Sequence, residues 1–76
     1  MSKAMSFYNA VHVIGIDNYS SIRAEFPTEM SKDELAIFGE KVAKACVDKM
    51  KEDGMYDSEI AKELGLSIQM VKKLVS

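Results

Sequence analysis

The sequence is poor in the residues that stabilise or activate many small proteins. It has 76 residues with one cysteine, Cys46, one histidine, His12, one proline and no tryptophan. One cysteine cannot close an intrachain disulfide, and one Cys with one His cannot complete a structural zinc site. A chain of this length builds one core, so we expect a single domain, residues 1–76, of modest stability.

Long apolar runs and catalytic clusters are also missing. No stretch approaches the roughly 20 apolar residues of a membrane span. Asn9 and His12 interrupt the N-terminal apolar run, so we expect no signal peptide and a cytoplasmic location. His12 and Cys46 fall on different predicted elements, and no glycine-rich phosphate loop is present. We therefore expect no enzyme activity, no cofactor and no metal.

Positive charge is scarce and local. Twelve acidic and ten basic residues give a net charge of −2, and residues 34–76 contain no arginine. The last ten residues differ, because they carry Lys72 and Lys73 and no acid. Any anion-binding surface must therefore be small, and the rest of the molecule would not attract nucleic acid from a distance.

The N-terminal third predicts a β-hairpin over residues 9–26. Residues 9–16 are rich in β-branched side chains, and residues 20–26 alternate between apolar and polar. Asp17-Asn18 between them is a turn signal, and Pro27 ends the second strand. With the helices predicted below, this gives an α+β fold. The hairpin either covers the helices or pairs with a second copy through its outer face, which carries Ile14, Ile16 and Tyr19.

A long helix is predicted over residues 31–53. Ser31 and Glu34 fit a capping box, and Gly54 is well placed to follow the helix end. Gly39 lies inside the helix, where we interpret it as room for the hairpin to approach. The predicted buried stripe consists of Leu35, Phe38, Val42, Cys46 and Met50, widened by Ala43 and Val47.

Two short helices, 58–64 and 67–75, follow in the stretch "EIAKELGLSIQMVKKLV". Ala61 is small where two helices would cross, Gly65 stands in the turn, and Ser67 is the predicted cap of the last helix. The apolar positions between helices are Ile60, Leu64, Leu66, Val71 and Leu74. This pattern resembles the helix-turn-helix of bacterial regulators, such as resolvase-like and response-regulator-type DNA-binding domains. The resemblance covers about residues 31–76.

The resemblance implies a small DNA-binding protein that regulates transcription as a homodimer, with residues 67–75 as its recognition helix. Gln69 suits an adenine edge, whereas Lys72 and Lys73 suit phosphates. The predicted DNA-binding residues are Ser67, Ile68, Gln69, Met70, Lys72 and Lys73.

A second interpretation is a protein-interaction module, a small regulator or inhibitor that uses the same scaffold without DNA. Ile68 and Met70 depart from the polar pattern of a recognition helix and would suit a protein partner. The acidic balance and the missing arginine favour this alternative. The target sequence, and whether the protein activates or represses, do not follow from these residues.

Overall fold

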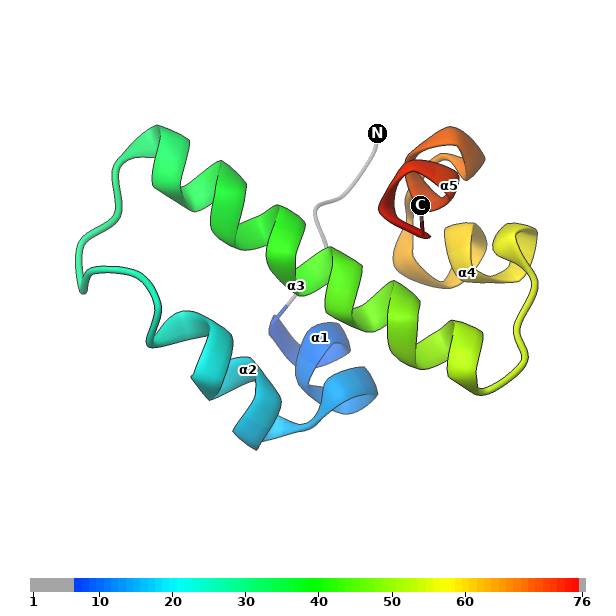
Figure 1. The fold of residues 1–76 in the computed structure, drawn as a ribbon, viewed down its shortest axis with the longest axis horizontal. Coiled ribbons are helices and arrows are strands. Elements are labelled where there is room, and N and C mark those ends of the chain that lie inside the picture. Colours follow the sequence, from blue (N-terminus) through cyan, green and yellow to red (C-terminus); the bar gives the residue numbers. More distant parts are fainter. Residues whose placement is uncertain (1–6, 76) are drawn as a thin grey trace.

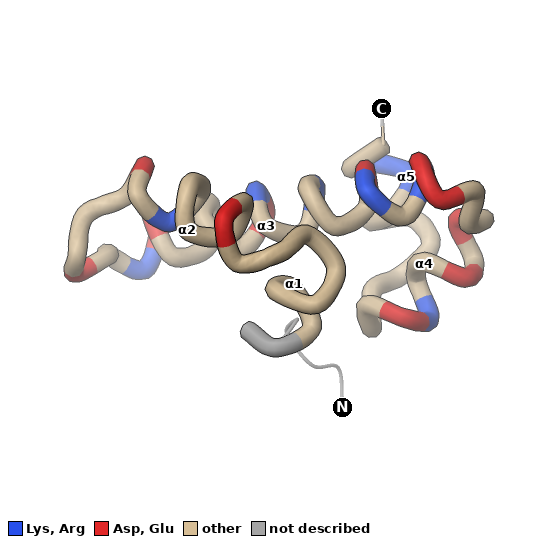
Figure 2. The backbone as a smooth tube through the Cα atoms, turned by 90° about the horizontal axis from the view of Figure 1, so that it is seen from below, with Lys and Arg blue, Asp and Glu red and all other residues tan. Residues whose placement is uncertain are grey.

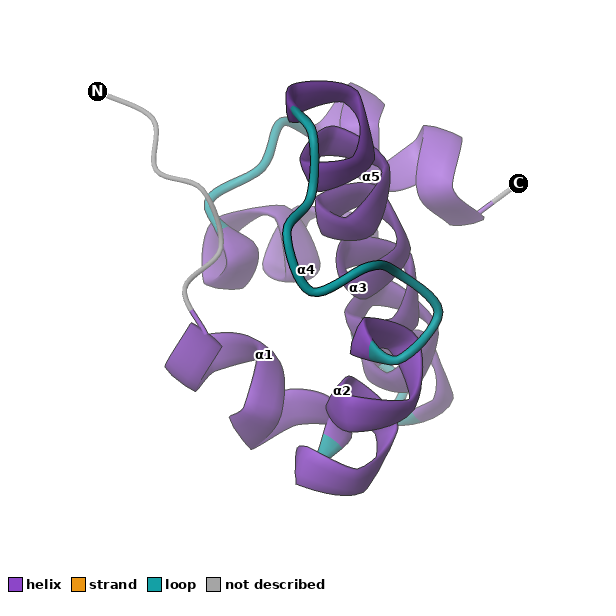
Figure 3. Cartoon of the chain, turned by 90° about the vertical axis from the view of Figure 1, so that its left-hand side faces the viewer, coloured by secondary structure: helices purple, strands orange, loops and turns teal. Residues whose placement is uncertain are grey.

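The computed structural model describes residues 7–75, and between these residues it contains helices and loops but no strand (Figures 1 and 3). The helices are α1 (Phe7–Ile14), α2 (Ile16–Arg23), α3 (Lys32–Glu52), α4 (Asp57–Leu64) and α5 (Ile68–Val75). The long helix α3 runs through the middle of the molecule. The pair α1–α2 packs on one part of it, and the pair α4–α5 packs near its C-terminal end.

The α+β prediction is wrong, because residues 9–26 form two helices rather than a hairpin. The expected turn residues Asp17 and Asn18 lie in the first turn of α2, and the Asn18 side chain donates a hydrogen bond to the Ile14 carbonyl (2.7 Å). That bond satisfies a carbonyl at the C-terminal end of α1. Between the two helices, Gly15 has a φ of 87°, a backbone conformation that costs glycine little.

The apolar residues of this region follow helical spacing once the helices are known. Tyr19, Ile22 and Phe26 recur at intervals of three and four residues, and all three pack against the core. Tyr19 and Phe26 both meet the ring of Phe38 edge-on, at centroid distances of 5.7 and 5.5 Å. Ile14, predicted on an outer face, is buried instead.

The predicted helix over 31–53 is α3, which has 21 residues. Both bonds of the capping box are present: Glu34 N–H donates to Ser31 Oγ (3.2 Å), and Ser31 N–H donates to the Glu34 carboxylate (2.9 Å). The predicted stripe is buried from Phe38 onward, but Leu35 is 55% exposed. No hairpin exists to cover Leu35, and α2 and the following loop pack on the Phe38 side of the helix.

The two short C-terminal helices begin and end within one residue of the predicted ranges 58–64 and 67–75. Gly65 follows α4 with a φ of 70°, the left-handed conformation expected at this turn. The N–H of Leu66 donates to the Ala61 carbonyl (2.9 Å), which closes the end of α4.

The buried residues form one cluster that draws on α1, α3, α4 and α5. Ile60, Val47, Val71 and Cys46 are its largest completely buried side chains. Because one cluster joins both helix pairs to α3, we treat the described chain as a single folding unit.

The loop between α2 and α3 is held by Arg23. Its guanidinium donates to the carbonyls of Pro27 (3.0 Å) and Thr28 (2.9 Å) and lies over the Phe38 ring, 5.9 Å from the centroid. The planar fork of arginine suits several acceptors at once. Arg23 therefore has a structural role, which the sequence did not reveal.

Candidate nucleic-acid interface

The outer face of α5 carries the residues that were predicted to contact DNA. Val71 and Leu74 are buried, and they anchor α5 against the rest of the core. Because a helix turns about 100° per residue, the remaining side chains point away from that anchor. The structure leaves all six predicted contact residues exposed: Ser67, Ile68, Gln69, Met70, Lys72 and Lys73. It thus brings them onto one short helix and the residue that precedes it.

The N-terminal end of α5 is fixed by Ser67. Its hydroxyl oxygen accepts a hydrogen bond from the N–H of Met70 at 3.1 Å, as an N-cap does. One lone pair and the hydroxyl proton of Ser67 remain for other partners. Capping is therefore compatible with a contact to a phosphate oxygen, which would accept the hydroxyl proton.

The C-terminal end of α5 is held by Lys44, which was not among the residues singled out from the sequence. Lys44 Nζ, from the middle of α3, donates to the Leu74 carbonyl at 2.9 Å and lies 3.6 Å from the carboxylate of Asp48. A cation at this position satisfies a carbonyl that has no partner within the helix and complements the helix dipole. The contact joins residues 30 positions apart, so no local pattern could have found it.

Two acids near α4 are engaged in contacts of their own. The Asp57 carboxylate lies 3.1 Å from Lys51 Nζ, and the Glu59 carboxylate accepts a hydrogen bond from the Tyr56 N–H (2.8 Å). Asp57 thus pairs with a lysine near the end of α3, and Glu59 caps the start of α4. Acidic and basic residues intermix along α3 and α4 in Figure 2, whereas α5 has two lysines and no acid.

Apolar side chains also reach the surface of α5. Ile68 is 42% exposed, Met70 38% and Val75 40%. Val75 was not among the predicted contact residues. Exposed apolar residues on a helix that also carries lysines are compatible with thymine methyl groups or with an apolar protein surface.

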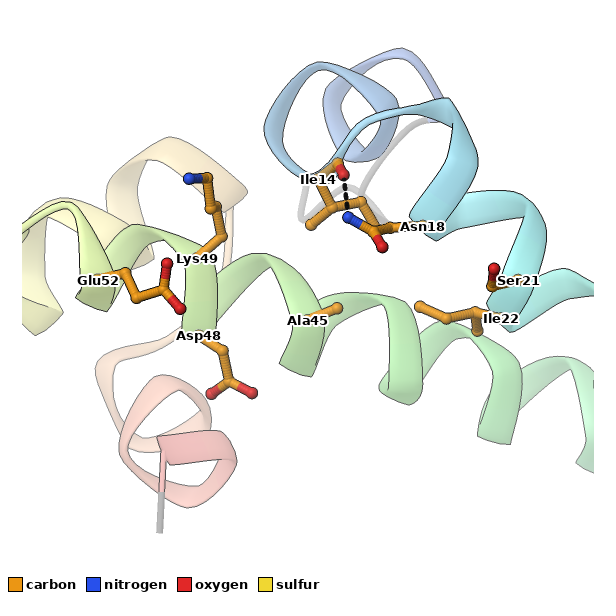
Figure 4. Close-up of a pocket in the computed structure, with 8 residues that line it drawn as sticks. All are labelled: Ile14, Asn18, Ser21, Ile22, Ala45, Asp48, Lys49 and Glu52. Carbon is orange, nitrogen blue, oxygen red and sulfur yellow. Dashed lines mark hydrogen bonds between the residues drawn. The ribbon is translucent and has the colours of Figure 1, made fainter.

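A groove between α2 and α3 also bears polar groups (Figure 4). Its volume is about 520 Å³, and Ser21, Asp48, Lys49 and Glu52 line it together with apolar residues. Asp48 and Lys49 already pair with Lys44 and Asp53 on α3. Ser21 lies at the opposite end of the groove from Lys49 and Glu52 in Figure 4, so these side chains do not form one catalytic group.

Neither a metal cluster nor a membrane span is found within residues 7–75. No group of three or more His, Cys, Asp or Glu side chains lies together there, and no helix in that range is long and apolar enough to cross a bilayer. Burial raises the pKa of the Cys46 thiol to about 11, so the thiol is protonated at neutral pH. A protonated buried thiol is a poor nucleophile.

No family model, curated protein or solved structure matches the chain. The fold alone therefore defines the class of protein. Over its described residues the protein is a small all-helical domain with a central helix and two pairs of short helices.

Proposed function

We propose that the protein binds double-stranded DNA, with α5 in the major groove, and regulates transcription in the cytoplasm. The observation that carries this proposal is the outward face of α5, which presents an amide and two lysines and no acid. An α-helix with its side chains is about 10–12 Å across, so α5 fits the width of the major groove, which is about 12 Å. Its buried side is held by Val71 and Leu74, so the helix can enter a groove without leaving its place.

Each outward residue has a defined role in this proposal. Gln69 donates to N7 and accepts from the amino group of an adenine, while Lys72 and Lys73 approach phosphates as point charges. Ile68 and Met70 contact thymine methyl groups. Ser67 donates its hydroxyl proton to a phosphate oxygen near the start of α5.

Few phosphates are neutralised in this arrangement, which sets the expected affinity. Two lysines and one hydroxyl per copy give weak binding to a single site, and each neutralised phosphate adds to the salt dependence. The net charge of −2 does not steer DNA toward the molecule. We therefore expect the affinity for duplex DNA to be highest at low salt and to fall steeply as the salt concentration rises.

The proposal is tested by selecting bound sequences from a pool of random duplex DNA at low salt. The intact protein should enrich one sequence, and Lys72→Ala/Lys73→Ala should lose that enrichment. The matched control is Lys41→Ala/Lys49→Ala, which removes the same charge from α3, where these lysines pair with Glu25 and Asp53. An equal loss in both double variants would mean that net charge, rather than α5, governs binding.

A protein partner is the second candidate, and the exposed Ile68, Met70 and Val75 favour it. Lys72→Ala/Lys73→Ala distinguishes the two, because it removes the phosphate contacts and leaves the exposed apolar group in place. It should abolish DNA binding and leave an apolar protein contact largely intact, whereas Met70→Asp should weaken either contact. No enrichment of any DNA sequence by the intact protein, even at low salt, would leave the protein partner as the supported function.

A further inference from the structure

The first turn of α5 presents one amide between two apolar side chains. Val71 is completely buried, and Gln69 lies about 160° around the helix from it, so Gln69 points away from the core. Ile68 and Met70 lie about 100° to either side of Gln69, and they are 42% and 38% exposed. The outermost direction of this turn therefore carries an amide, with an apolar side chain on each flank.

The two lysines of α5 lie one turn further along the helix. Lys72 and Lys73 belong to the last turn. When a recognition helix lies in the major groove, the residues near its N-terminal end contact the base edges. In that arrangement the first turn of α5 reads the bases, and the lysines of the last turn approach the phosphates that border the groove.

The apolar flanks of this turn match thymine. Thymine alone among the four bases presents a methyl group in the major groove, whereas guanine and cytosine present hydrogen-bond acceptors and donors there. An isoleucine or methionine placed against those polar edges would remove water from them without offering a hydrogen bond, which costs free energy. Ile68 and Met70 therefore favour thymine and disfavour guanine and cytosine.

The amide at the centre of the turn matches adenine. A glutamine side chain forms two hydrogen bonds with N6 and N7 of adenine, and guanine is read most often by arginine or lysine. The helix α5 contains no arginine, and both of its lysines lie in the last turn. The first turn of α5 thus lacks the side chains that most often read guanine.

We propose that α5 selects an A·T-rich site, in which Gln69 reads an adenine while Ile68 and Met70 bury the methyl groups of neighbouring thymines. This inference rests on the proposed function, because it names the class of DNA sequence that the same face of α5 binds. One buried CH₂ group is worth a factor of about four in affinity, so two buried methyl groups give a factor of about 15.

The test compares two duplexes that differ only in methyl groups. The duplex sequence that the protein enriches at low salt should be A·T-rich, and it is made once with thymine and once with deoxyuridine in place of every thymine. This exchange keeps the base pairing and the charge of the duplex. The intact protein should bind the deoxyuridine duplex about 15-fold more weakly, as measured by fluorescence anisotropy.

A protein variant separates methyl contact from an effect on DNA shape. Ile68→Ala/Met70→Ala removes the side chains that contact the methyl groups and should bind the two duplexes equally. Loss of the methyl groups can also change the shape and stiffness of the duplex, which any protein that deforms DNA would sense. A preference for thymine that persists in this variant would assign the preference to DNA shape and overturn the proposal.

The matched control removes exposed apolar side chains elsewhere. Ile16→Ala/Ile37→Ala changes α2 and α3 only, and it should keep the full preference for thymine. Enrichment of a G·C-rich sequence by the intact protein, or equal affinity for the two duplexes, would overturn this inference and leave the proposed function standing. Failure to bind any duplex, even at low salt, would contradict the proposed function itself and this inference with it.

Discussion

Two pairs of eight-residue helices pack on α3, and they make an instructive comparison. In α1–α2 and in α4–α5, a glycine with positive φ, Gly15 or Gly65, stands at the junction. The sequence predicts the second pair to within one residue at each end and predicts the first pair as a hairpin. Two helix pairs of similar architecture thus differ in how clearly their local sequence patterns predict helices.

The difference lies in what competes with the helical signal. In α4–α5, the apolar spacing, the small residue at the crossing, the glycine and the serine cap all indicate two helices. In α1–α2, β-branched residues and an Asp-Asn pair suggest strands and a turn, while the spacing of Tyr19, Ile22 and Phe26 suggests a helix. The structure follows the helical spacing: Tyr19 and Phe26 contact the Phe38 ring and Ile22 packs against the core. Ala24, which belongs only to the strand pattern, is exposed.

The largest effect should come from truncating the shared core on either side of α3. Ile60→Ala and Ile14→Ala each remove a buried side chain, and each should lower the free energy of unfolding by about 2–5 kcal/mol. Urea unfolding followed by circular dichroism measures both, and each variant should unfold in one transition. Two transitions in either variant would show that the helix pairs do not belong to one folding unit.

A smaller effect is expected from the residue that holds the loop after α2. Arg23→Ala removes the donors to the Pro27 and Thr28 carbonyls and the contact with Phe38, and it should cost about 1–2 kcal/mol. Arg23→Lys keeps the charge but lacks the planar fork, so it should recover only part of the loss. Full recovery in the lysine variant would mean that charge alone holds this loop.

Burial of Cys46 in α3, between the two helix pairs, predicts a pH dependence of stability. Burial raises the pKa of this thiol from its ordinary value of 9.0 to about 11, so the folded state binds the proton more tightly than the unfolded state. The resulting stability is fully present below pH 9 and is lost as pH rises toward 11, by about 1 kcal/mol at pH 10. Thermal unfolding at pH 8 and pH 10 measures this loss. Cys46→Ala should show a smaller decrease, and an equal decrease would assign the effect to other groups.

The smallest changes in the free energy of unfolding, about 0.5–1 kcal/mol, are expected when either of two glycines is replaced by alanine. Gly65→Ala forces a left-handed backbone on alanine and should destabilise the α4–α5 junction. Gly39→Ala enters open space inside α3 and should stabilise the helix. Both are measured as shifts in urea midpoint at low protein concentration. Effects of the same sign would contradict the backbone argument.

Much of the C-terminal half could be predicted because its determinants are local. The capping box at Ser31, the cap at Ser67 and the left-handed Gly65 each depend on residues a few positions apart. Contacts between distant segments could not be read in the same way. The hydrogen bond from Lys44 to the Leu74 carbonyl and the exposure of Leu35 depend on which helices pack against each other. Because residues 9–26 were predicted as a hairpin, this packing could not be predicted.

The predicted contact residues of α5 are all exposed, but exposure is a weaker result than binding. The most direct test of the proposed function is the salt dependence of duplex DNA binding for the intact protein and for Lys72→Ala/Lys73→Ala. Each phosphate contact contributes about 0.9 to the slope of log affinity against log salt. If the two lysines bind phosphates, the double variant should bind more weakly, and its slope should be shallower by about 2. An unchanged slope and affinity would contradict the role assigned to α5.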